Sequence, residues 1–99
     1  MLSNDTIEDI IHQKIKEEEY VIARNLGDYN IDEISSPKKI QINEENVWEI
    51  TYKYSVFVHD TDPDNMTLGR TYEYQKTIFL NANGAIINET EKELLIEWQ

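Results

Sequence analysis

The stretch VWEITYKYSVFVHDTDPDN, residues 47–65, decides the fold, because its first part alternates apolar and polar side chains over the length of a long strand. We expect one side of this strand to be buried and the other to face water. The apolar side carries large residues, namely Trp48, Ile50, Tyr52, Tyr54, Val56 and Val58. The segment HDTDPDN then predicts a turn, since Asp, Asn and Pro favour turns.

Further segments extend this strand into a sheet. Apolar residues alternate again over 71–80, except at Lys76, which we expect near an edge of the sheet. A short strand at 40–42 precedes a hairpin at NEEN, and Asn83-Gly84 predicts a two-residue type I′ turn before a strand at 85–88. The prediction is an antiparallel meander of three to four strands.

The N-terminal segment predicts a helix that covers the apolar face of this sheet. Asp5 lies three residues before Glu8, which resembles a capping box, and Gly27 is placed to end the helix. An interruption near Glu18 leaves open a shorter helix followed by a strand at 20–24. The apolar residues on one side of the helical projection are Ile7, Ile10, Ile11, Ile15, Val21, Ile22 and Leu26.

Two segments are harder to assign. Residues 27–39 are rich in turn-forming residues and predict a connecting loop. The tail at 90–98 predicts a short C-terminal helix, because Thr90 and Glu93 form a second capping pattern, although alternation at Leu94 and Ile96 leaves a strand possible. The whole chain is thus expected to form one α+β domain, residues 1–99, with two layers.

The composition limits the kinds of function. Twenty acids against nine bases give a net charge of −11, which disfavours direct binding to nucleic acid or to an anionic membrane. The chain has no cysteine, which excludes disulfides and thiolate chemistry. The acidic N-terminus and the lack of a long apolar run predict a cytoplasmic protein.

The segment HDTDPDN invites a comparison with calcium-binding loops. Asp60, Asp62 and Asp64 match the first alternating ligands of an EF-hand, but Asn65 replaces the required glycine and Thr71 replaces the bidentate glutamate. We therefore predict no metal site and no cofactor. His59 beside these acids has no second histidine nearby, and no serine lies in a nucleophile motif, so we do not expect an enzyme.

Two surfaces remain as candidates for binding. The first consists of acidic residues that we expect to contact a basic protein: Asp60, Asp62 and Asp64 at the hairpin tip, then Glu17, Glu18 and Glu19 on the helix. The second is a possible small-ligand pocket lined by Trp48, Tyr52, Tyr54, Tyr72 and Tyr74, although such aromatic residues more often fill a core.

The function that fits these features best is an acidic inhibitor that occludes a basic partner, such as a nuclease or a DNA-binding protein. Immunity proteins, antitoxins and phage-encoded inhibitors are of this physical type. The spacing of alternate acids at the hairpin tip would also permit mimicry of DNA. The alternative is a ligand-binding module, or one that forms a homodimer across an exposed edge of the sheet.

Overall fold

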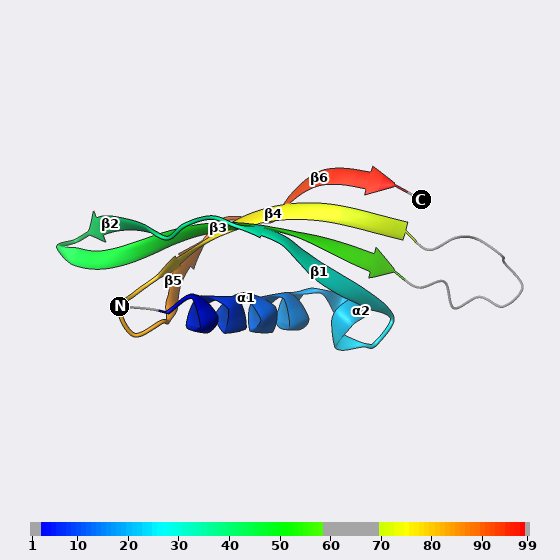
Figure 1. Ribbon diagram of the computed structural model, residues 1–99, viewed down its shortest axis with the longest axis horizontal. Coiled ribbons are helices and arrows are strands. Elements are labelled where there is room, and N and C mark those ends of the chain that lie inside the picture. Colours follow the sequence, from blue (N-terminus) through cyan, green and yellow to red (C-terminus); the bar gives the residue numbers. More distant parts are fainter. Residues whose placement is uncertain (1–2, 59–69, 99) are drawn as a thin grey trace, which may run out of the picture.

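A computed structural model of the chain describes residues 3–58 and 70–98. Within these residues the chain forms an N-terminal helical segment and six strands in one antiparallel sheet, with the helices on one face (Figure 1). The α+β class is confirmed, but the predicted number of strands, three to four, is too low. In chain order the elements are α1 (Asn4–Glu18), α2 (Tyr20–Ala23), β1 (Gly27–Ile34), β2 (Lys38–Ile42), β3 (Glu45–Val58), β4 (Arg70–Leu80), β5 (Ile86–Glu89) and β6 (Glu93–Trp98).

Two long strands, β3 and β4, form the centre of the sheet, and each has two short strands along its outer side. β1 pairs with the second half of β3 and β2 with the first half. In the same way β6 pairs with the first half of β4 and β5 with the second half. On each outer side, the two short strands follow one another along the chain with a short interruption between them. The strand count exceeds the prediction because β1 and β6 lie where a loop and a helix were expected.

The two interruptions are held by hydroxyl side chains. On one side Ser35 Oγ accepts a hydrogen bond of 2.9 Å from the amide of Thr51, and on the other Thr90 Oγ1 accepts one of 3.1 Å from the amide of Thr77. Thr51 and Thr77 face each other across β3 and β4, with their hydroxyls 2.8 Å apart. The side chains satisfy amides that would otherwise lose a ladder partner where each outer strand breaks.

The core lies between α1 and the sheet. Ile7, Ile11 and Ile15 recur every four residues, so they lie on one side of the helix, and all three are buried. Burial contributes about 2 kcal/mol for each such side chain, which stabilises a helix of this length more than its intrinsic propensity does. The sheet supplies Ile50, Tyr52, Tyr54, Val56, Ile78 and Leu80, as the alternation of β3 and β4 predicted.

The helical segment differs from the prediction at three points. α1 begins after Ser3, whose Oγ accepts a hydrogen bond from the amide of Thr6, so Asp5 is not the cap. The helix breaks at Glu19, which is extended, and resumes as the short α2 rather than as a strand. Asn25, with φ of 58°, reverses the chain after α2, and Gly27 opens β1.

The predicted loop at 27–39 is wrong over most of its length, because residues 27–34 form β1. Tyr29 and Ile31 alternate with polar residues and pack against the core. A register shift between Ile31 and Glu33 then breaks the alternation. This bulge hid the strand from a reading based on strict period two.

The tail is also a strand, and the predicted C-terminal helix at 90–98 is wrong. Leu94 pairs with Tyr74 and Ile96 with Glu73, which leaves Leu95 in a second bulge. Tertiary pairing with β4 decides the structure of a segment in which helical and strand periods both fit.

The two predicted hairpins are present, with one difference in geometry. Asn43 and Glu44 both have positive φ, 51° and 68°, as a two-residue type I′ turn requires. At the second hairpin only Gly84 has positive φ, and the amide of Asn81 bonds the carbonyl of Ala85. This is a three-residue loop with glycine in the left-handed position, so the predicted type I′ turn at Asn83-Gly84 is wrong.

Candidate functional site

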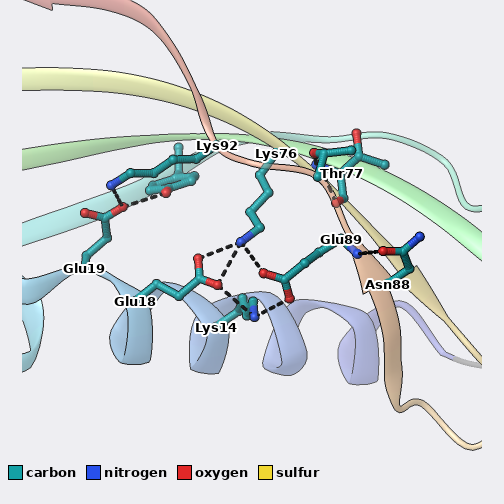
Figure 2. A network of polar contacts seen from close by, with 10 residues as sticks. Lys14, Glu18, Glu19, Lys76, Thr77, Asn88, Glu89 and Lys92 are labelled. Carbon is teal, nitrogen blue, oxygen red and sulfur yellow. Dashed lines mark hydrogen bonds and ion pairs between the residues drawn. The ribbon is translucent and has the colours of Figure 1, made fainter.

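The most concentrated group of charges in the described structure lies between α1 and the sheet (Figure 2). Lys76 is in the middle of β4, not near an edge as expected, and its side chain is only 5% exposed. Its ammonium donates to both carboxylate oxygens of Glu18, each at 2.8 Å, and to Glu89 Oε1 at 2.9 Å. A lysine on the apolar face of a strand is thus compensated by two carboxylates.

Lys14 completes a closed ring of alternating charges. Its ammonium lies 2.7 Å from Glu18 and 2.6 Å from Glu89, so each carboxylate contacts both lysines. Hydrogen bonds from Lys14 and Lys76 lower the pKa of Glu89 to about 2. Burial disfavours the charged form of Lys14, but its bonds to Glu18 and Glu89 outweigh this and raise its pKa. The ring joins α1 to β4 and β5.

A buried carboxylate, Glu19, lies one residue beyond Glu18 of the ring. Glu19 is only 6% exposed, and its Oε1 accepts hydrogen bonds from the Tyr54 hydroxyl at 2.7 Å and from Lys92 at 2.8 Å. Burial, followed by the bond to Glu19, raises the pKa of Tyr54 well above its usual value. Lys92 also lies over the Tyr74 ring, 4.3 Å from its centroid. These contacts explain why the helix breaks at Glu19, since the extended backbone turns its side chain inward.

The ring and the Glu19 cluster therefore have the character of a structural junction. Every charged group in them has an opposite charge within 3 Å, and each links the helical segment to the sheet. No group of three or more metal-binding side chains is found in residues 3–58 and 70–98. One signal for this junction is visible in the sequence, namely the lysine at position 76 on an otherwise apolar face.

The structure describes only some of the predicted partner-binding residues. Asp60, Asp62 and Asp64, together with His59, lie outside the described residues. Glu17 is exposed on α1, where it accepts a hydrogen bond of 2.9 Å from Gln13.

Glu18 and Glu19 differ from Glu17, because their carboxylates are bound to lysines of the same chain. The three glutamates do not form one solvated acidic face. A role in contacting a partner stays a prediction for all three glutamates, and the carboxylates of Glu18 and Glu19 also take part in the junction.

The aromatic residues predicted to line a pocket lie mainly in the core. Tyr52 and Tyr54 are each 1% exposed and belong to the cluster beneath α1. Tyr74 is half-buried against Tyr54 and Tyr72, at ring distances of 5.5 and 6.2 Å, and Trp48 is half-buried opposite Leu80. The described hollows along α1 are lined by other residues. A small-ligand pocket at these aromatics stays a prediction without support from this arrangement.

An acidic hollow of about 460 Å³ lies where α1 meets the outer side of β1. Glu8 and His12 line it from the helix, and Asp32 and Glu33 line it from the bulge in β1. The His12 ring nitrogen Nδ1 is 2.6 Å from the Tyr29 hydroxyl, which fixes the imidazole against the strand. The residues that line this hollow include three carboxylates and no lysine or arginine, and the sequence did not reveal it, because β1 was read as a loop.

Comparisons with protein-family models, with curated proteins and with solved structures find no match for this chain. None of the described helices is long and apolar enough to cross a membrane.

Proposed function

We propose that this chain is a small acidic binding protein that occludes a basic partner, such as a nuclease or a nucleic-acid-binding protein. Inhibitors of this type include immunity proteins, antitoxins and phage-encoded proteins. The function requires no reaction centre. It requires a surface of negative potential that attracts the partner and holds it in one orientation.

The observation that carries the proposal is the distribution of the net charge. Lys14, Lys76 and Lys92 are bound to Glu18, Glu89 and Glu19, and this balanced set contributes no net charge. The net charge of −11 therefore resides on the rest of the chain, where acids exceed bases even more strongly. A surface of this kind accelerates association with a cationic protein and repels nucleic acids.

The acidic hollow between α1 and β1 offers a specific contact on this surface. Glu8 and Glu33 are exposed at its rim, so a basic side chain of a partner could enter it without displacing a buried group. The two oxygens of Asp32 accept hydrogen bonds from the side chains of Asn30 and Ser55, so Glu8 and Glu33 are the acids of the hollow that a partner would contact first.

Capture from a lysate of the source organism, and of competing or host strains, tests the proposal. The immobilised chain should retain a basic protein at low ionic strength and lose it at moderate ionic strength. With the purified partner, Glu8→Gln/Glu33→Gln should lower the association rate about fivefold, and Asp60→Asn/Asp62→Asn/Asp64→Asn should do the same.

The matched control is Glu44→Gln/Glu45→Gln, which removes two exposed charges at the β2–β3 turn and should have a smaller effect. Retention of no basic protein, or retention that does not depend on salt, would contradict the proposed function.

A further inference from the structure

The strand β6 exposes apolar side chains on both of its faces. Leu94, Leu95 and Ile96 are 49%, 36% and 45% exposed, although they are consecutive residues of one strand. In a sheet with one covered face, every second side chain of a strand is normally buried. Here α1 lies beneath the central strands and does not reach β6, which runs along the far side of β4 (Figure 1). Within residues 3–58 and 70–98, no helix or further strand therefore covers these three adjacent apolar residues.

The outer backbone edge of β6 is also open in the described structure. β6 pairs with β4 on one side, and no other described strand pairs with it. Such an edge presents amide and carbonyl groups that can bind one further strand. Proteins usually protect open edges with proline, lysine or charged side chains that point inward. The segment Glu93–Trp98 contains none of the first two, and its only charged residues, Glu93 and Glu97, flank the apolar triplet.

The charges on β6 indicate what kind of strand could bind. If two copies of β6 paired along this edge, Glu93 and Glu97 of both copies would be brought into one short seam. Like charges close together destabilise a strand pair, and two chains of charge −11 repel each other as well. A strand that carries lysine or arginine near Glu93 and Glu97 would gain from the same positions.

We propose that β6 is a docking edge for an extended segment of a partner protein that carries both basic and apolar residues. The segment adds to the sheet as a seventh strand, its backbone pairs with β6, and its apolar side chains pack beside those of Leu94, Leu95 and Ile96. This inference rests on the proposed function, since it identifies where a basic partner attaches. It differs from the acidic hollow, which is bounded by α1 and by β1, on the other side of the sheet.

A labelled heptapeptide of alternating lysine and valine provides a direct test. Fluorescence anisotropy at low ionic strength should show saturable binding to the wild-type protein. Glu93→Lys/Glu97→Lys should weaken this binding about tenfold, because two favourable charge pairs become unfavourable. The matched control Glu44→Lys/Glu45→Lys changes the net charge equally at the opposite end of the sheet and should weaken it less than about threefold.

A second peptide separates strand pairing from attraction between charges. It has the same sequence with N-methyl groups on alternate residues, which keeps every charge and removes backbone donors. Its affinity should be about tenfold lower, and hydrogen exchange at residues 94–97 should slow only with the unmodified peptide. Equal affinity of the two peptides, equal losses in the two protein variants, or no binding at all would overturn the docking edge.

Sedimentation of the wild-type protein alone tests whether β6 binds a second copy of the chain instead. A dimer that Glu93→Lys/Glu97→Lys disrupts would mean that β6 binds a second copy, and would overturn the heterologous docking edge. The outcome for the proposed function is separate. If a partner is captured from lysate and the β6 variant binds it normally, only the docking edge fails. If the peptide binds β6 but no basic protein is captured, the proposed function fails.

Discussion

The two outer sides of the sheet share one plan but are attached to the rest of the molecule by different chemistry. On the β1–β2 side, Tyr29, Ile31 and Ile34 pack against the core, and the ion pair from Lys53 to Glu33 is long, at 3.5 Å, and exposed. On the β5–β6 side, Glu89 and Lys92 bind charged residues of α1 and Glu19. One side is held mainly by apolar packing, and the other mainly by charges.

The two kinds of anchoring leave different side chains exposed to solvent. Apolar packing draws the side chains of β1 inward and leaves polar residues on its outer side. Ion pairs anchor β5 and the connection before β6 at single points, and leave Ile87 and the β6 triplet uncovered. Anchoring by charges is thus compatible with an open apolar edge, whereas anchoring by packing is not. Substitutions on the two sides can test whether packing holds the β1–β2 side and charges hold the β5–β6 side.

The largest effect should follow removal of the central lysine of the ring. Lys76→Ala leaves Glu18 and Glu89 with Lys14 alone and opens a space on the helix-facing side of β4, which should lower the free energy of unfolding by about 3 kcal/mol. Urea unfolding monitored by circular dichroism measures this change. The control on the other side, Lys53→Ala, should change stability by less than about 0.5 kcal/mol, because its ion pair is exposed. Similar losses in both variants would contradict the contrast.

A nearly equal loss of stability is expected for Gly27→Ala on the β1 side, where the cause is a steric clash. Gly27 opens β1 opposite Val58, and a Cβ at this position would collide with the backbone carbonyl of Phe57. Since a backbone atom cannot move aside as a flexible side chain can, Gly27→Ala should destabilise the protein by about 2 kcal/mol. Thermal unfolding should show this loss at low and at high salt alike. A loss that depends on salt would mean that charges also hold β1.

A smaller effect is expected at the Glu19 cluster. Tyr54→Phe removes the hydroxyl that donates to the buried Glu19 carboxylate and leaves it with Lys92. Loss of a hydrogen bond to a buried charge should cost about 1.5 kcal/mol. Tyr52→Phe is the matched control, since Tyr52 is equally buried but makes no hydrogen bond to Glu19 in the described structure. If Tyr52→Phe costs as much as Tyr54→Phe, the bond to Glu19 does not contribute to stability.

The smallest loss of stability is expected for Glu89→Gln, and this loss should depend on pH. Because the pKa of Glu89 falls from its ordinary 4.5 to about 2 on folding, its contribution is complete above pH 4.5 and is lost as the pH falls toward 2. Glu89→Gln should remove on the order of 1 kcal/mol at pH 7, discounted because the side chain is 37% exposed. The difference between wild type and variant should shrink between pH 4.5 and pH 2.5. A difference that stays constant over this range would contradict the ionised role of Glu89.

Sequence patterns predicted the long central strands and the helix, and missed the short outer strands β1 and β6. The strict alternation of β3 predicted the centre of the sheet, and the spacing of Ile7, Ile11 and Ile15 predicted the helix that packs against it. β1 and β6 each contain a register shift, which breaks period two within a short strand. The Tyr29 and Ile31 alternation was a signal for β1, but the turn-forming residues beside it outweighed this signal.

The charged junction could be predicted only in part. Lys76 was conspicuous in the sequence as a charge on an apolar face, and a buried lysine requires carboxylates nearby. Its partners could not be identified, because Glu18 precedes it by 58 residues and because twenty acids were available. Glu17, Glu18 and Glu19 look alike in sequence, and only the break of the helix at Glu19 separates their environments.

The ring of charges also bears on the order in which the chain folds. Lys14 and Glu89 are 75 residues apart, and Glu19 and Lys92 are 73 apart, so α1 cannot complete these bonds until the last strands are in place. Contacts of such long range form late, because the loop they close is entropically costly. We therefore expect Lys76→Ala to accelerate unfolding while leaving the folding rate nearly unchanged, which stopped-flow measurements in urea can establish. A slower folding rate in this variant would mean that the helix docks before the sheet is complete.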